Sequence, residues 1–221
     1  MKAENSVLIK NIYYMLAYAY KALRRDGFEK VAAESFDNIH DLFAAILIKG
    51  IEYQIKQGLT KEYVKSCRLQ KTLRGKIDIA GTVGQMTKRS KQLSCVYGVL
   101  TEDNLFNRIL KSAVILLLNH CEVKHENKIA LKKLLPFLSN VCDIKPLEIN
   151  WSLLSYRKGN ASYQMLIYLC RLLFEGMIIS HDGRVKLAKF LDGQHLCDLY
   201  ETFVRAYYER HYPQLNPRAA Y

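Results

Sequence analysis

Residues 61–79, with the sequence KEYVKSCRLQKTLRGKIDI, decide the fold because a strand pattern replaces a helical one there. From Tyr63 to Leu69 the side chains alternate between two faces, as they do in a β-strand. The segment Arg74–Ile79 is short and bounded by turn residues. Gln92–Leu100 is again rich in strand-forming residues. We therefore predict three antiparallel strands.

These strands form a small β unit over about residues 61–100, inserted between helices. The stretch Met86–Lys91, with the sequence MTKRSK, is its most polar and most basic part. Polar loops lie on protein surfaces and often carry function, so we expect this stretch to be an exposed loop.

Two helices are expected before the β unit. Apolar residues recur at intervals of three and four over Asn11–Tyr20, which predicts a buried helix. A second apolar stripe runs through Ser35–Gln57, where Ser35 or Asp37 can cap the start and Gly58 can stop the helix. Together they predict a helical hairpin.

Helical periodicity returns after the β unit, and Thr101 can cap the first of these helices. Further helices are expected up to Pro213, followed by an unstructured tail from Asn216. The predicted helical ranges are Thr101–Cys121, Asn127–Ser139, Ala161–Ile179 and Gln194–His211. The predicted fold class is α+β, mainly helical, with the small inserted antiparallel β unit.

Composition places the chain among globular proteins. Half of its 221 residues are hydrophobic, which is ample for a core. Its six cysteines show no CxxC pair or zinc-finger spacing, so we expect reduced thiols and no bound metal. No stretch is long and apolar enough to span a membrane, and no secretory leader is evident, which favours a cytoplasmic protein.

The net charge of +12 is uneven, because nine basic and only two acidic residues lie between Lys61 and Lys91. Such a surface favours polyanionic partners. Basic residues on strands beside tyrosines could follow a phosphate backbone, or could dock onto an acidic protein face. They could also form a solvated surface with no partner. The candidates for DNA contact are Lys61, Lys65, Arg68 and Lys71.

Motifs for catalysis are sparse. The chain has no GxxxxGK[ST] or GxGxxG phosphate loop, no GxSxG elbow and no HExxH pair. Its six histidines are interpreted as surface or core residues, and no catalytic residue is assigned. Metal-dependent nucleases need an acid and a D/E-x-K on neighbouring strands. Glu122–Lys124 and Asp143–Lys145 match the tripeptide, but neither has a strand-borne partner acid, so both are interpreted as solvated polar residues.

Four segments together resemble the McrC family, the nuclease subunit of McrBC restriction systems that act on modified cytosine. The resemblance extends from about Lys10 to Pro213, and the first and third segments are specific in combination. The segments are NIYYMLAYA (residues 11–19), LRGKI (73–77), LTEDNLFNRILKS (100–112) and LYETF (199–203).

The resemblance implies a subunit that binds a hexameric McrB-type AAA+ GTPase and stimulates its GTP hydrolysis. In that family a β-rich part of the amino-terminal region enters the GTPase ring, and a carboxy-terminal PD-(D/E)xK domain cleaves DNA with Mg²⁺. GTP binds to the partner, so no cofactor is expected in this chain. From charge and loop position we choose Arg74, Lys76, Lys88 and Arg89 as the candidates for contact with the ring.

The resemblance also predicts where the chain departs from the family. The family's acidic and D-x-K motifs follow the LYETF-like segment by several tens of residues, whereas this sequence stops at Tyr221. We therefore expect residues 1–190 to be the regulatory region and 191–221 to be the start of a truncated nuclease domain.

Three hypotheses follow: an activator of a GTPase ring, a basic DNA-binding module or inactive remnant, and an intact nuclease that uses Asp143.

Overall fold

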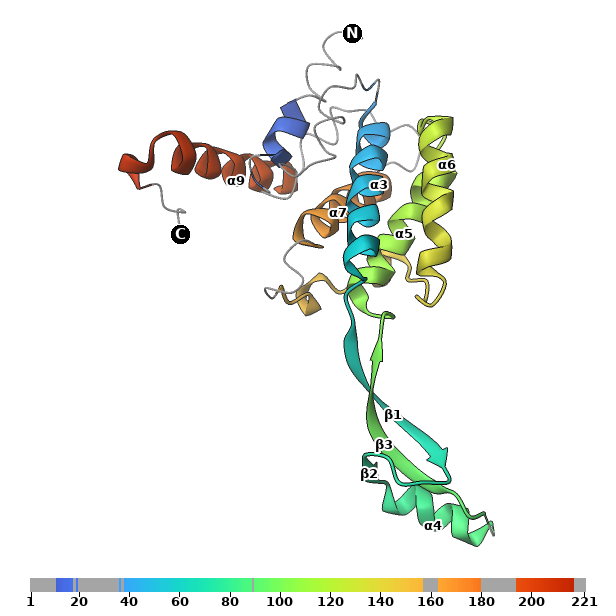
Figure 1. The fold of residues 1–221 in the computed structure, drawn as a ribbon. Coiled ribbons are helices and arrows are strands. Elements are labelled where there is room, and N and C mark those ends of the chain that lie inside the picture. Colours follow the sequence, from blue (N-terminus) through green and yellow to red (C-terminus); the bar gives the residue numbers. More distant parts are fainter. Residues whose placement is uncertain are drawn as a thin grey trace.

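The computed structural model consists of a helical body from which a long finger extends (Figure 1). It describes residues 11–17, 19, 36, 38–88, 90–156, 163–179 and 194–216. Residues 11–17 and 19 are helical, and Ile12 and Leu16 are fully buried, as the apolar periodicity predicts. The predicted connection to the next helix lies outside the described residues.

Helix α3 (Ile39–Gln57) runs through the centre of the body. Its cap is Asn38, whose side chain accepts a hydrogen bond from the Asp41 amide at 2.8 Å. The predicted start at Ser35 or Asp37, both outside the described residues, is therefore too early. Gly58 ends the helix as predicted, with a φ of +86° that favours glycine.

Helices α5 (Leu105–Asn119), α6 (His125–Leu134) and α7 (Tyr163–Ile179) pack around α3. The cap of α5 is Asn104, and the predicted cap Thr101 instead ends a strand. Periodicity predicts the next helix at Asn127–Ser139. Pro136 lies in the last turns of that range, and these turns form a 3-10 helix instead of continuing α6. The 3-10 helices are η2 (Leu135–Leu138), η3 (Pro146–Glu148), η4 (Trp151–Leu153) and η6 (Pro213–Leu215).

Helix α9 (Gln194–His211) has the predicted bounds and extends away from the body (Figure 1). Leu199 is buried in the main core, whereas Tyr200 and Tyr208 are exposed. Asn216 follows η6 in the left-handed conformation, and the rest of the predicted tail lies outside the described residues. No described helix is both long and apolar enough to cross a membrane.

The finger comprises residues 62–101, of which Arg89 is not described. Its strands are β1 (Glu62–Gln70), β2 (Lys76–Ile77) and β3 (Leu93–Thr101), arranged in the antiparallel order β1-β3-β2. This confirms the predicted α+β class and the three strands. The tip differs, because α4 (Ile79–Thr87) occupies part of the stretch expected to be strand and loop. Figure 1 shows α4 lying beside the sheet at the far end of the finger.

Candidate functional site

Strand register divides the basic side chains of the finger between two faces. Lys65 pairs with Gly98, and Lys76 pairs with Val96 two residues earlier, so the two lysines share a face. Arg68 pairs with Cys95 and therefore belongs to the opposite face. The four residues chosen for DNA contact thus do not form one continuous basic stripe.

Arg74 lies on the same face as Arg68, because it stacks on Tyr97. Its guanidinium carbon is 4.3 Å from the centre of the Tyr97 ring, a cation–π contact. Gln70 donates a hydrogen bond of 2.9 Å to the Tyr97 hydroxyl, which fixes the ring from its other end. Arg74 is thus an exposed cation held in a defined position.

The other sequence-predicted site residues are scattered along the finger. Lys61 forms an ion pair of 3.2 Å with Glu102 at the base, so its charge is partly neutralised. Lys71 is exposed just after β1, and Lys88 is exposed at the carboxyl end of α4. Arg89 lies outside the described residues.

Helix α4 is attached to β3 by a small polar cluster. Asp78 caps the helix by accepting from the Gly81 amide at 3.2 Å, and it also accepts from the Ser94 hydroxyl at 3.0 Å. These two bonds, the first above all, hold the pKa of the Asp78 carboxyl below its usual value. Thr82 is buried, and its hydroxyl accepts from the Ser94 amide at 3.0 Å. The tip is therefore built around a helix that includes Met86 and Thr87 of the predicted loop, whereas Lys88 and Lys91 lie outside helices and strands and are exposed, as predicted.

The outer face of α4 carries an exposed apolar stripe that sequence reasoning missed. Ile79, Val83 and Met86 are 74%, 55% and 64% exposed. Their spacing of four and three residues puts them on one side of the helix. This helical spacing is the feature of the sequence from which the stripe could have been predicted. Exposed apolar side chains gathered at the end of a projection are typical of a protein interaction site.

A buried hydrogen-bond network joins both ends of the finger to the body. Asn107 is fully buried and donates to the carbonyls of Thr60 at 3.0 Å and Glu102 at 2.7 Å. Thr60 comes just before the finger in the chain and Glu102 just after it, so both carbonyls lie at its base. The Tyr163 hydroxyl donates to Asn107 at 3.0 Å and accepts from the Thr60 amide at 2.9 Å. Asn104 adds a bond of 2.7 Å to the Thr60 carbonyl. The network fixes the direction in which the finger leaves the body.

Asp103 and Arg108 strengthen the same junction. Arg108 donates two hydrogen bonds of 2.7 Å to the Asp103 carboxylate, which also accepts from the Cys142 amide at 2.9 Å. The paired guanidinium holds the pKa of Asp103 far below its usual value. Four polar residues of the segment 100–112, which carried part of the family resemblance, therefore help to position the finger: Asp103, Asn104, Asn107 and Arg108.

The two D/E-x-K tripeptides lie outside the sheet. Glu122 precedes α6 and contacts His40 at 3.1 Å, so it is not simply solvated as expected. Asp143 lies in a connection and forms an ion pair of 2.8 Å with Lys111, whose ammonium also donates to the Val141 carbonyl. Within the described residues neither acid lies on a strand beside a second carboxylate, which is the arrangement metal-dependent nucleases use.

The described residues form a helical body and a finger that buried hydrogen bonds anchor to it. Exposed cations and an apolar stripe lie on the finger. These features define a finger-bearing subunit whose exposed groups for binding a partner lie on the finger. The comparison with family models is consistent with that class and narrows it. The chain belongs to the McrBC 5-methylcytosine restriction system component family, whose model matches residues 2–218. The resemblance noted in the sequence is thereby confirmed.

Similar proteins support the same assignment. The type IV methyl-directed restriction enzyme EcoKMcrBC of Escherichia coli (strain K12) is 23% identical over 215 residues, covering 96% of this chain and 62% of the relative. The cryo-EM structure of the Thermococcus gammatolerans McrBC complex matches with a TM-score of 0.62 and 21% identity. That match covers 91% of this chain and 58% of the other.

A second Thermococcus gammatolerans structure, a half-complex from a tetradecameric assembly of McrB AAA+ hexamers with bound McrC, matches with a TM-score of 0.56 and 22% identity. It covers 80% of this chain and 39% of the other. At these identities the structural matches show a shared fold. The chain spans about three fifths of the length of its Escherichia coli relative.

Proposed function

We propose that this chain is an McrC-like subunit of a GTP-dependent restriction system directed against modified foreign DNA. It binds an McrB-type AAA+ GTPase ring through the finger and stimulates GTP hydrolysis. Family membership supports the choice of partner, and the matched Thermococcus structure contains McrC bound to McrB AAA+ hexamers. The observation that carries the proposal is the finger, with exposed cations and an apolar stripe at its tip.

The dimensions and chemistry of the finger suit insertion into a ring. Nine-residue strands rise about 3.4 Å per residue, so the stalk reaches roughly 30 Å from the body. The apolar stripe on α4 supplies area that a partner pocket can bury, which is where most binding energy arises in interfaces. Arg74 and Lys88 supply positive charge that steers the tip toward an acidic surface.

GTP turnover by the cognate McrB-type protein, measured with and without the chain at equal concentration, tests this proposal. We expect the intact chain to stimulate turnover. Val83→Asp places a charge in the apolar stripe and should abolish stimulation, and Arg74→Ala should weaken it. Lys133→Ala, which removes an exposed cation from α6 in the body, is the matched control and should behave as wild type.

The result is interpretable only for folded protein, so each variant is first compared with wild type by circular dichroism and thermal unfolding. Exposed substitutions on α4 should leave both unchanged. A folded chain that does not stimulate turnover would overturn the proposal. Stimulation that survives Val83→Asp would remove the α4 stripe from it.

We further propose that the chain acts as the activator and that GTP binds to the partner. The cleavage chemistry, with its Mg²⁺, is assigned to a nuclease domain of the McrC type. The environment of Asp143, which pairs with Lys111 rather than with a second carboxylate, supports this division. Plasmid cleavage by the purified chain with Mg²⁺, lost in Asp143→Ala, would contradict it.

The six free thiols, four of them exposed, support a reducing compartment such as the cytoplasm.

Direct DNA binding is a second candidate function, favoured by one feature of the sheet. Arg68 and Arg74 lie on the same face as the Tyr97 ring. Cations beside an aromatic ring are used to hold a nucleic-acid strand. This function predicts an affinity that depends strongly on salt.

A further inference from the structure

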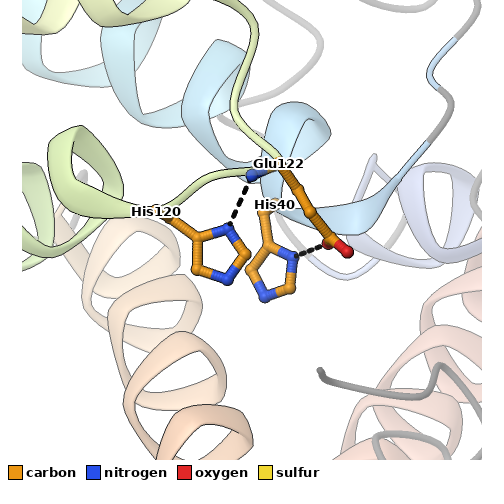
Figure 2. Close-up of side chains that lie close together, drawn as sticks. All are labelled: His40, His120 and Glu122. Atoms are coloured by element: carbon orange, nitrogen blue, oxygen red, sulfur yellow. Dashed lines mark hydrogen bonds and ion pairs between the residues drawn. The ribbon is translucent and has the colours of Figure 1, made fainter. Parts of the chain in front are cut away.

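Three side chains with metal-binding atoms meet on the body, far from the finger. His40 lies in the first turn of α3, His120 follows the last residue of α5, and Glu122 lies in the turn before α6. One possible ligand atom from each lies within 4.8 Å of the others. Figure 2 shows the two imidazole rings side by side, with the Glu122 carboxylate next to His40. Sequence spacing gave no sign of this cluster, since 82 positions separate His40 from Glu122.

The hydrogen bonds of the cluster indicate which of the two Nδ1 atoms carries a proton. His40 Nδ1 lies 3.1 Å from a Glu122 carboxylate oxygen, which can only accept, so this nitrogen carries the proton. The Glu122 amide donates to His120 Nδ1 at 3.3 Å, so that nitrogen is unprotonated. The rings stack with centroids 3.9 Å apart. Two cationic imidazoles would repel each other at this distance.

Burial supports the neutral state. It lowers the pKa of His40, which is 4% exposed, and the Glu122 carboxylate only partly offsets this effect. Burial also lowers the pKa of His120, and the adjacent His40 lowers it further. Neutral imidazole is the form that binds metal ions.

The segment that carries two of the three ligands is fastened to the helix that carries the third. Asn38 donates to the Glu122 carbonyl at 2.8 Å. Asp41, fully buried, accepts from the Lys124 amide at 3.0 Å and from the Asn127 side chain at 2.8 Å. Such supporting bonds orient ligands and are a regular feature of metal sites. Asp41 is occupied in this role and is not counted as a ligand.

We propose that His40, His120 and Glu122 form a binding site for a divalent transition metal ion, for which Zn²⁺ fits the ligand set best. Two imidazoles and one carboxylate, with water in the fourth position, are a known three-ligand zinc arrangement. Mg²⁺ and Ca²⁺ prefer all-oxygen sites and are disfavoured here. The ion takes the place of the proton between His40 and Glu122, and that proton moves to Nε2 of His40.

The geometry needs a modest contraction to hold the ion. Bonds of about 2.0–2.2 Å place tetrahedral ligand atoms roughly 3.4 Å apart, so the widest pair must close by up to roughly 1.5 Å. His120 and Glu122 are the more exposed members and can supply this movement. His120 also lines an open groove of about 500 Å³, and Glu122 is exposed, so two of the three residues are accessible from solvent.

Titration of the purified 221-residue chain with Zn²⁺ against a chromophoric chelator tests the site. We expect one ion per chain and a raised thermal unfolding temperature. Co²⁺ should bind with the visible absorption of a tetrahedral nitrogen- and oxygen-ligated ion, and Mg²⁺ should not compete. His120→Ala and Glu122→Gln should each weaken Zn²⁺ binding by at least about 100-fold, beyond the 10- to 100-fold typical of a lost outer partner.

Two control variants separate this site from incidental binding. His125→Ala removes an exposed histidine at the start of α6, and Cys121→Ser removes the thiol between the two predicted ligands. Both should bind Zn²⁺ as wild type does. Absence of binding by folded wild-type protein would overturn the proposal, as would binding that survives His120→Ala and Glu122→Gln. An equal loss in Cys121→Ser would also overturn it, because the thiol would then be a ligand.

Discussion

Removal of the Tyr163 hydroxyl should loosen the junction between finger and body. Tyr163→Phe keeps the ring in place but deletes two hydrogen bonds, one to Asn107 and one from the Thr60 amide. Each bond is worth about 1 kcal/mol net, and a partly buried amide left without a partner adds to the cost. We expect the free energy of unfolding to fall by about 2–3 kcal/mol.

A double-mutant cycle makes this prediction specific. Asn107→Ala deletes three side-chain hydrogen bonds and should cost about 3–4 kcal/mol. Because the Tyr163–Asn107 bond is lost in both single variants, the double variant should cost about 1 kcal/mol less than their sum. Burial raises the pKa of Tyr163 to about 12, so the cost should not change between pH 6 and 9.

Urea unfolding, followed by the fluorescence of the single tryptophan Trp151, measures these costs. Tyr156→Phe is the matched control. Tyr156 packs against the Phe106 ring as Tyr163 does, but it is 40% exposed and its hydroxyl lies outside the network of Asn107 and Thr60. Its removal should cost less than about 0.5 kcal/mol. Equal costs for the two tyrosines, or strict additivity in the cycle, would refute the network as the anchor of the finger.

Three further predictions concern the finger and its base. In Gly81→Ala the new methyl group meets the Asp78 carboxylate and the Ser94 side chain, so amide exchange in α4 should accelerate, whereas Gly84→Ala points into open space and should not accelerate it. The lowered pKa of Asp103 gives stability that is present above about pH 4 and is lost as the pH falls toward its folded value, so Asp103→Asn should reduce the difference in unfolding free energy between pH 6 and pH 3. If the finger binds DNA, Arg68→Ala should reduce the slope of log affinity against log salt by about 1, and an unchanged slope would exclude Arg68 from phosphate contact.

Periodicity predicted the regular elements well, because each depends on local sequence. The last helix has the predicted bounds, and β1 and β3 lie within one residue of theirs. Helix α4 was missed because it is short, contains Gly81 and Gly84, and depends on a cap and on packing against Ser94. Asn104 displaced Thr101 as a cap for a similar reason, since the strand before it continues through Thr101.

The candidate sites were harder to predict, because they depend on contacts between distant residues. Charge alone indicated the finger as the basic surface, but strand register decides which cations share a face. Alternation along β1 already puts Lys65 and Arg68 on opposite faces, whereas the face that Lys65 shares with Lys76 is clear only once their partners on β3 are known. The His40 cluster had no sequence signal, since helix packing brings its members together.

The anchored base gives the finger a mechanical property. The start of β1 and the end of β3 are both bonded, through Thr60 and Glu102, to the same buried Asn107 side chain. The stalk is therefore fixed at its base and does not hinge freely there. Over roughly 30 Å, a tilt of about 10° at the base moves the tip by about 5 Å. A force applied to α4 therefore reaches α5 and α7 as a torque, carried by hydrogen bonds that single substitutions can remove.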